Sequence, residues 1–276
     1  MVFVYKAWEK FCAKLKERGL VSIPASEVRT EMHTYLVLKH DVETNVAKAH
    51  KMAAIEHRYG HRGSYYVQAY LMKDDANIKL LREMQGMGHE ISYHYDVMDS
   101  CHGDLDRAIA EFDKNKEIFE VNGFIINTVC QHGNPVVKRV GYTSNRDFFR
   151  SEKVRSFYPH IKDIMVNFKS KVPTDYLYFS DAGRQFKLIF DPVNNDREPS
   201  DDKNIAYEDL DALVGAFASE KGNIISTHPH RWTDTALVYQ AKAFAFKIIK
   251  QTAKQLVKIP LLKNVMSRYY YLAKKI

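Results

Sequence analysis

Short apolar runs alternate with amphipathic segments along most of the chain. Apolar residues recur at the three- and four-residue spacing of helices at about 6–18, 45–58, 105–122 and 208–218, and again at Ile78, Leu81 and Met84. Runs of β-branched and aromatic residues fall between them, at about 35–39, 64–70, 90–94, 124–130 and 223–228. This alternation predicts an α/β protein in which helices cover a mainly parallel sheet.

The region between about 131 and 202 has a weaker pattern. Candidate strands remain at 164–168 and 176–180, separated by loops rich in Asn, Asp, Pro and Gly. With these two, about seven strands alternate with helices along the chain. The pattern therefore predicts either a parallel β/α barrel or an open doubly wound sheet.

Length and composition fit one large domain with its own core, since the chain has 276 residues and is 45% hydrophobic. Cys12, Cys101 and Cys130 are far apart and form no CxxC pair, which argues against a disulfide framework and suits a reducing compartment. The first residues lack the apolar core of a signal peptide, and no apolar run reaches the roughly 18 residues that a membrane span needs. We therefore expect a cytoplasmic protein.

Charge is distributed unevenly along the chain, because every acidic residue lies at or before Asp234. The residues after it contribute +9 to the net charge of +7, which leaves −2 for residues 1–234. Apolar residues alternate with these basic residues at helical spacing. We therefore expect a domain at 1–235, including an N-terminal helix and loop at 1–32 that pack on it, followed by a basic amphipathic helical tail at 236–276.

Two roles fit the predicted tail. It could dock on the domain with its lysines in solvent, or it could contact an anionic membrane surface as a peripheral segment, which would place the protein at the inner face of the membrane. A nucleic-acid partner is not expected, because the basic and aromatic pattern of a known nucleic-acid module does not occur.

Four of the predicted strands end in a histidine. His40 and Asp41 follow the first strand, and His94, His132 and His228 follow the third, fourth and last. Parallel strands bring these ends to one edge of a sheet, where ligands bind. Imidazoles and a carboxylate suit a borderline divalent metal, above all zinc, which acidifies water and polarises an acyl oxygen. The pattern therefore predicts a catalytic metal site.

The motifs around these histidines resemble the divergent polysaccharide deacetylases of the NodB-homology superfamily, of the carbohydrate esterase family 4 type. The resemblance extends over about 33–235, and the segments that carry it are 39–43, 88–96, 131–135, 178–184 and 227–232. It implies a distorted (β/α) barrel of seven strands. It also implies a metal-dependent hydrolase that removes acetyl groups from N-acetylated sugars.

Placed on this sequence, the resemblance gives Asp41 and His94 the positions of metal ligands. His40 stands where the family has a general-base aspartate, and an imidazole can do that work because its ordinary pKa is near neutrality. The second histidine of the metal pair is replaced by Met98, and a thioether is a poor ligand for zinc. The third ligand must therefore come from elsewhere, and His132 is our choice, with Asp96 and His102 as the next candidates.

The later motifs imply the remaining roles. His228 matches the histidine that protonates the leaving amine, and Asp181 and Arg184 either orient it, hold substrate or form an ordinary salt bridge. We expect three residues to contact the sugar, with the alternative that the tryptophan packs at the barrel rim: Asn134, Arg231 and Trp232. We interpret Glu43 as a solvated carboxylate or one that favours the start of a helix.

Three functional hypotheses follow from the sequence. The first is a metal-dependent deacetylase acting on an N-acetylated sugar or polysaccharide precursor, which could be linked to a lipid or a nucleotide. The second is a catalytically silent glycan-binding barrel, which the departures at His40 and Met98 motivate. The third is a metal-dependent phosphoesterase, because sites of His and Asp at barrel mouths serve that chemistry too.

Overall fold

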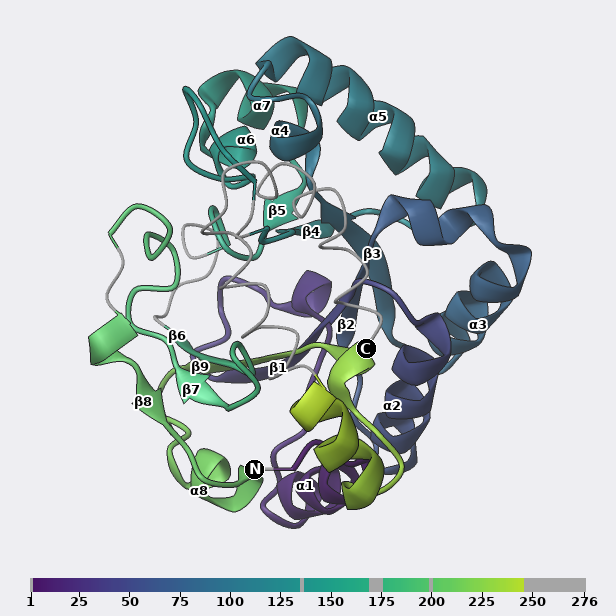
Figure 1. Ribbon diagram of the computed structural model, residues 1–276, viewed down its shortest axis with the longest axis vertical. Helices are drawn as coiled ribbons and strands as arrows, with labels where there is room; N and C mark the ends of the chain where they lie inside the picture. Colours follow the sequence, from purple (N-terminus) through teal and green to yellow (C-terminus); the bar gives the residue numbers. More distant parts are fainter. Residues whose placement is uncertain (1, 135–136, 169–175, 199–200, 246–276) are drawn as a thin grey trace.

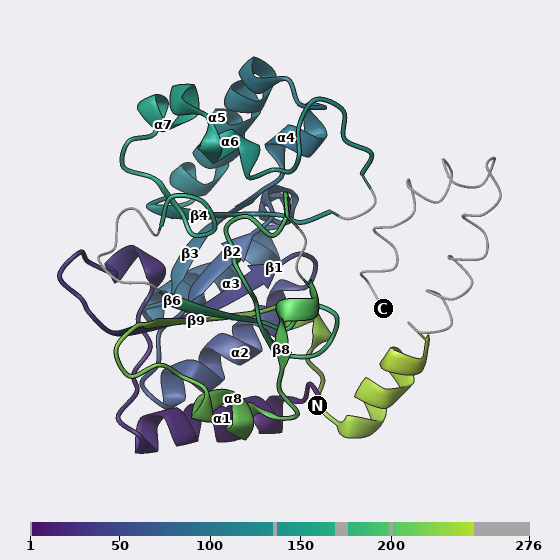
Figure 2. The ribbon, with the colours of Figure 1, turned by 90° about the vertical axis from the view of Figure 1, so that its left-hand side faces the viewer.

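The computed structural model describes residues 2–134, 137–168, 176–198 and 201–245. The predicted tail beyond residue 245 lies outside the described residues, so its structure stays a prediction. Residues 236–245 form a helix beside the N-terminal segment, with the rings of Phe3 and Tyr239 5.8 Å apart (Figure 2). In the part of the chain that the structure describes, we find no helix with the length and apolarity that a membrane crossing requires.

A mainly parallel sheet forms the centre of the molecule (Figure 1). Its strands are β1 (Tyr35–Val42), β2 (Ser64–Val67), β3 (Glu90–Tyr95), β4 (Thr128–Gln131), β5 (Lys162–Asp163), β6 (Tyr176–Ser180), β7 (Lys187–Leu188), β8 (Ile205–Ala206) and β9 (Gly222–Thr227). They lie in the order β5-β4-β3-β2-β1-β9-β6-β7-β8. The strands from β5 to β6 in this order pair in parallel, and β7 and β8 join antiparallel.

The predicted α/β class with about seven parallel strands is therefore confirmed. The predicted closure into a barrel is a separate matter, because it requires the two ends of the strand order to meet. Within the described ranges, β5 and β8 end the hydrogen-bonded order and do not pair with each other. Closure of the barrel stays a prediction.

Helices cover the outer face of this curved sheet, where Figure 1 shows α1, α2, α3 and α5 outside the strands. The helices are α1 (Tyr5–Glu17), α2 (Val46–Arg58), α3 (Asp75–Gly86), α4 (Val97–Ser100), α5 (Leu105–Val121), α6 (Asp147–Arg150), α7 (Glu152–Phe157) and α8 (Leu210–Gly215). Side chains of Asn45, Asp74 and Asp104 cap the starts of α2, α3 and α5 by accepting backbone N–H groups. Short 3-10 helices are η1 (Ala25–Glu27), η2 (Ala69–Lys73), η4 (Asp201–Lys203) and η5 (Pro229–Arg231).

All residues of β1 are buried, because the strand has neighbours on both faces. Leu36 and Leu38 point outward into the cluster that contains Trp8 of α1. Tyr35 and Val37 point inward into a different cluster, with side chains from β4, β6 and β9. Since successive side chains of a strand point to opposite faces, odd-numbered residues of β1 line the interior and even-numbered residues meet the helices.

Two predicted strands differ from the structure. The strand expected at 164–168 lies earlier, at β5, and the chain then turns back, since the carboxylate of Asp163 accepts a hydrogen bond from the backbone N–H of Met165 at 2.7 Å. The strand expected at 124–130 begins only at Thr128, and Ile125 before it is 73% exposed. In both regions apolar residues occur in turns or irregular segments, where the hydrophobic pattern does not indicate a strand.

Candidate active site at the carboxyl end of β1

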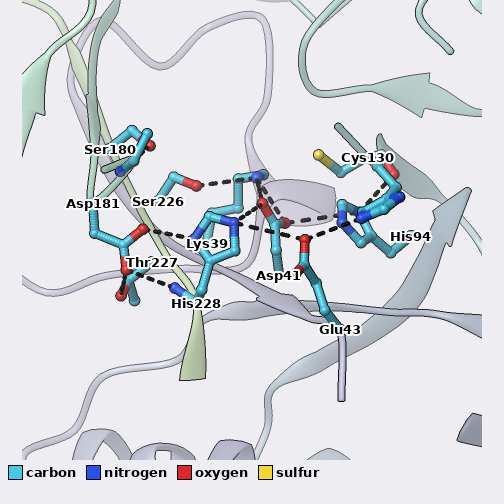
Figure 3. A network of polar contacts seen from close by, with 12 residues as sticks. Lys39, Asp41, Glu43, His94, Cys130, Ser180, Asp181, Ser226, Thr227 and His228 are labelled. Carbon is cyan, nitrogen blue, oxygen red and sulfur yellow. Dashed lines mark hydrogen bonds and ion pairs between the residues drawn. The ribbon is translucent and has the colours of Figure 1, made fainter. Parts of the chain in front are cut away.

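Lys39, Asp41 and Glu43 lie on the interior face of β1 and its continuation, at the centre of a buried polar network (Figure 3). The neighbouring strands β3, β4, β6 and β9 run parallel to one another in this part of the sheet, so their carboxyl ends bring further polar side chains to the same place. The prediction that strand-end residues meet at one edge therefore holds for most of the histidines, but not for His40.

Lys39 holds Asp41 through both carboxylate oxygens. Its Nζ lies 2.7 Å from each oxygen and 3.1 Å from Oγ of Ser226 on β9. Burial alone favours the neutral amine, but the Asp41 carboxylate outweighs it, and the pKa of Lys39 lies well above its ordinary value. Burial would likewise raise the pKa of Asp41, but Lys39 and two histidines lower it below the ordinary value. Asp41 is therefore an ionised carboxylate that is hydrogen-bonded to the ammonium group of Lys39.

His94 on β3 has a defined tautomer. Its Nδ1 lies 3.0 Å from the carbonyl oxygen of Cys130, which only accepts, so Nδ1 carries a proton. Burial lowers the pKa of His94 to about 3, so the ring is neutral near pH 7 and Nε2 keeps its lone pair. Metal-binding histidines commonly donate their other N–H to a carbonyl in this way. His94 thus offers Nε2 as a ligand atom.

Two groups of ligand atoms share His94. One contains Asp41 and Cys130, the other contains Glu43 and His132, and in each group the atoms lie within 4.8 Å of one another. In the second group, Glu43 Oε1 is 3.2 Å from His132 Nε2. The three ligands expected from the sequence are therefore close together, but Asp41 and His132 fall in different groups.

The group of Glu43, His94 and His132 fits a divalent metal better. Asp41 faces the protonated Nδ1 of His94 at 3.9 Å and already binds Lys39. Burial raises the pKa of Cys130 well above its ordinary value, so its sulfur is a protonated thiol and a poor ligand. Two imidazoles and a carboxylate are a donor set that zinc uses in catalytic sites.

Met98 lies outside both groups. It is buried in the apolar cluster on the outer side of β3, together with Tyr95 and Phe112. Its side chain therefore contributes to packing, and the residue that stands beside His94 is His132 from the loop after β4. This placement agrees with the choice of His132 as the third metal ligand.

His228, directly after β9, is held on the other side of Asp41. Its Nδ1 lies 2.6 Å from Oδ1 of Asp181, and its backbone N–H donates to Oδ2 at 2.9 Å. Thr227 Oγ1 and the Arg231 guanidinium donate to the same carboxylate at 2.7 Å each. Burial would raise the pKa of Asp181, but Arg231 and His228 outweigh it and hold that pKa far below the ordinary value. Asp181 is therefore an ionised group that orients the His228 ring.

The free edge of the His228 ring faces both carboxylates of β1. Nε2 lies 3.8 Å from Asp41 Oδ2 and 4.0 Å from Glu43 Oε1, which is too long for hydrogen bonds. The His228 side chain is 15% exposed, so solvent reaches it. This nitrogen is thus placed to exchange a proton with a molecule bound between the two sides.

His40 lies on the opposite face of β1, away from this site. Its Nε2 is 2.9 Å from Oε1 of Glu56 on α2, and its ring stacks on Tyr65 with centroids 4.2 Å apart. The side chains of His40 and Glu56 are both 0% exposed. The structure therefore contradicts the expectation that His40 is the general base, because neighbouring residues of a strand point to opposite faces and Asp41 occupies the inner one.

Trp232 does not face a ligand. It is 0% exposed and packs edge-on against Phe3 and Trp8, with centroids 5.1 and 5.0 Å away. Its Nε1 donates to Thr227 Oγ1 at 2.8 Å. The expected stacking on a sugar is therefore wrong, and the alternative holds, because the tryptophan packs in the contact between α1 and the end of β9.

Among the described residues, Arg231, and not Arg184, forms the ion pair with Asp181. Arg231, expected to contact the sugar, donates to the Asp181 carboxylate and to its carbonyl oxygen at 2.6 Å. Arg184 instead contacts Asp181 through its backbone N–H at 3.0 Å, and its side chain hydrogen-bonds Tyr239. Asn134, in the loop after β4, accepts Arg139 at its carbonyl oxygen. A substrate contact of the Asn134 side chain stays a prediction.

Sequence reasoning missed Lys39, Glu43 and His230. The signal for the first two was present, because residues 39, 41 and 43 alternate and must share one face of a strand. His230 lies two residues after His228, and its Nδ1 is 4.0 Å from Glu43 Oε2. Burial lowers the pKa of His230 to about 3.

No protein-family model matches the chain, and no curated protein matches it. Among solved structures it is similar to a family 4 carbohydrate esterase from Streptomyces lividans in complex with acetate, at 13% identity and a TM-score of 0.44, over 74% of this chain and 83% of that chain. It is also similar to a mutant of the peptidoglycan deacetylase PdaC from Bacillus subtilis, at 9% identity and a TM-score of 0.39, over 81% and 99% of the two chains.

A third similar structure is a peptidoglycan deacetylase from Bdellovibrio bacteriovorus, at 13% identity and a TM-score of 0.34, over 75% of this chain and 48% of that chain. The first of the three is a family 4 carbohydrate esterase, the type that the motifs resemble.

Proposed function

We propose that this protein is a metal-dependent hydrolase that removes an acetyl or other acyl group from an N-acetylated sugar or polysaccharide precursor. The observation that carries the proposal is that Asp41 lies between two groups of side chains with different roles. On one side lie Glu43, His94 and His132, a donor set for a divalent metal. On the other lies His228, oriented by Asp181. The motif resemblance supports the substrate class.

Glu43, His94 and His132 are the residues that would hold the metal, and zinc is the best match to this donor set. When bound, a divalent cation polarises the acyl oxygen and acidifies a water molecule. The tautomer of His94, fixed by the Cys130 carbonyl, leaves the correct nitrogen available for this role.

Asp41 and His228 move the protons. Asp41 is ionised and fixed by Lys39, so it can accept a proton from the attacking water, the role that His40 cannot fill. His228 carries a proton on Nε2 to the leaving nitrogen, and the Asp181 carboxylate stabilises the charged imidazole in the meantime. The two groups face each other at 3.8 Å, which places both beside a ligand bound between them.

Acetate release from oligomers of N-acetylglucosamine by the full chain tests the proposal, before chelation, after it, and after zinc is restored. We expect one metal ion per chain, loss of acetate release on chelation, and recovery with zinc. Glu43→Gln and His94→Ala should lose the metal, whereas Asp41→Asn should keep it and lose turnover. His57→Asn, at an exposed site on α2, is the control and should change neither.

Other outcomes would favour the alternatives. Binding of the oligomers without acetate release, unaffected by chelation, would support a silent glycan-binding barrel. Hydrolysis of generic phosphoesters in place of acetate release would support a phosphoesterase. A chain that binds no metal, and in which Asp41→Asn leaves acetate release unchanged, would contradict the proposal.

We also propose that residues 236–276 contact an anionic membrane surface at the cytoplasmic side. Three exposed apolar residues on the helix at 236–245 support this: Leu237, Val238 and Phe244 are 76%, 44% and 67% exposed. The basic residues that follow in the sequence would add attraction to acidic lipids, about 1 kcal/mol for each one near the surface.

Vesicle flotation tests this contact. The full chain should float with vesicles containing phosphatidylserine and not with vesicles of phosphatidylcholine alone. The double variant Leu237→Ser with Phe244→Ser should float less, whereas Val121→Ser, at an exposed site on α5, should behave as the original chain. Equal flotation with both lipids, or with none, would contradict the proposal.

A further inference from the structure

His230 lies at the edge of the site on η5, and no part of the proposed mechanism uses it. Its ring meets that of His228 edge-on, with centroids 5.7 Å apart. Its Nδ1 lies 4.0 Å from Oε2 of Glu43, on the opposite carboxylate oxygen from the one that faces His132. The side chain is 14% exposed, so it borders the site and stays partly accessible to solvent.

The backbone around His230 is held from three directions. Lys48 on α2 donates from Nζ to the carbonyl oxygens of His230 and Trp232, both at 2.6 Å. Arg231 binds Asp181, and Trp232 binds Thr227. Because its own carbonyl group and the two residues after it are held in this way, the position of the His230 backbone is set before any ligand arrives.

The Nδ1 atom of His230 is buried and has no hydrogen-bond partner among the described residues. Leaving a buried polar atom unpaired costs about 1–3 kcal/mol, so an atom held in this state beside a reactive centre needs an explanation. The gap of 4.0 Å to Glu43 is too long for a direct hydrogen bond. One oxygen atom at about 2.8 Å from each side would span it.

We infer that His230 is a substrate-binding residue that hydrogen-bonds a hydroxyl group of the sugar next to the acylated position. A hydroxyl both donates and accepts, so it can donate to Glu43 Oε2 and accept from Nδ1–H of the imidazole. A simple acetate ester without hydroxyl groups cannot make this contact. The inference rests on the proposed function and adds to it a residue that selects carbohydrate over other acyl compounds.

Two variants separate this role from a structural one. His230→Phe keeps the ring shape and removes the hydrogen-bonding nitrogen, and His230→Asn keeps a polar group near the position of Nδ1. We expect His230→Phe to raise KM for N-acetylglucosamine oligomers about fivefold to tenfold, the effect of one lost hydrogen bond. Activity toward 4-nitrophenyl acetate, metal content and thermal unfolding should stay as in the original chain, and His230→Asn should recover most of the loss.

The outcomes distinguish this inference from the proposed function. If the original chain releases acetate and His230→Phe has the same KM, the inference is wrong and the function stands. If no acetate is released but oligomer binding, measured by calorimetry, weakens in His230→Phe, the function is wrong and the binding role stands. Loss of the metal in both variants would make His230 a ligand instead and overturn the inference, and a chain that neither binds nor cleaves the oligomers would overturn both.

Discussion

The two faces of β1 bury the same kinds of side chain and use them differently. On the outer face, His40 meets Glu56, and neither side chain has any exposed surface. On the inner face, Asp41 and Glu43 face His228, whose side chain is 15% exposed. Both are histidine and carboxylate clusters on one strand, so residue type alone does not separate a structural cluster from a functional one.

In the outer cluster, the Glu56 carboxylate has partners on both oxygens. Glu56 Oε1 accepts Trp8 Nε1 at 3.0 Å and lies 2.9 Å from His40, and Oε2 accepts the Tyr65 hydroxyl at 2.9 Å. These donors occupy both oxygens of the buried carboxylate. Such a cluster fixes α1 and α2 on the sheet and leaves no position from which Glu56 could reach a ligand.

The inner cluster is satisfied only in part. Lys39 holds Asp41, and Asp181 holds Nδ1 of His228, but Nε2 of His228 is 3.8 Å or more from the two carboxylates in front of it. A distance of this size excludes a hydrogen bond, so Nε2 can still bond to a ligand that binds beside the carboxylates. The comparison therefore points to solvent access: Nδ1 of His40 also has no hydrogen-bond partner in the described part of the chain, but that side chain is fully buried, whereas the His228 side chain is 15% exposed.

The largest effect is expected from His228→Ala on the inner face. Loss of a general acid lowers kcat by about 10²–10⁴-fold. The unfolding temperature should change little, because the ring is partly exposed and only Asp181 depends on it for charge pairing. Acetate release and thermal unfolding measure the two quantities. A variant that keeps its turnover would remove His228 from the mechanism.

The matching change on the outer face, His40→Ala, should act on stability instead. It leaves the buried Glu56 carboxylate without its His40 partner, which costs about 3–5 kcal/mol of unfolding free energy. The folded variant should keep its metal and its kcat, because His40 does not reach the inner face. Urea unfolding measures the first effect and acetate release at low temperature the second.

His50→Ala is the control for this comparison. Its Nε2 also lies 2.9 Å from a carboxylate, that of Glu83, but both side chains are partly exposed, at 25% and 44%. Exposed pairs contribute about 0–1 kcal/mol, so this variant should unfold nearly as the original chain does. If His40→Ala instead unfolds like the control and loses its kcat, His40 is the base after all.

The sequence predicted the sheet better than the site. Parallel strands with buried apolar runs were recognisable, and so were the histidines at their carboxyl ends. The two-residue strands β7 and β8 are too short to produce a periodic pattern. Of the site residues, Asp41, His94, His132 and His228 were predicted, since each ends a strand and the resemblance supplied roles for most of them.

The errors have physical causes. His40 was assigned to the site because the motif was read as a continuous string, whereas a strand alternates and places Lys39, Asp41 and Glu43 together. For Trp232 the sequence left stacking on a sugar and packing at the barrel rim open, because its contact with Phe3 joins residues that lie 229 positions apart and no local pattern predicts such a contact. The sequence contains no indication of a role for His230 other than its position two residues after His228.

The smallest expected effect is confined to acid pH and concerns Glu56. Burial alone would raise its pKa, but His40 outweighs burial, with help from His89 and Tyr65, so the pKa in the folded protein lies below the ordinary value. A carboxyl whose pKa is lower when folded contributes stability above its unfolded pKa, about 4.3, and loses that contribution as the pH falls through the folded value. The unfolding free energy of the original chain should therefore fall toward that of Glu56→Gln as the medium is acidified.

Urea unfolding over a series of pH values measures this convergence, with Glu83→Gln as the exposed control. The control should run parallel to the original chain, because an exposed pair is screened by solvent. Parallel curves for Glu56→Gln as well would mean that the charge on Glu56 does not stabilise the outer face. The contrast between a fully buried outer face held together by charge and an inner face that solvent reaches would then lose its physical basis.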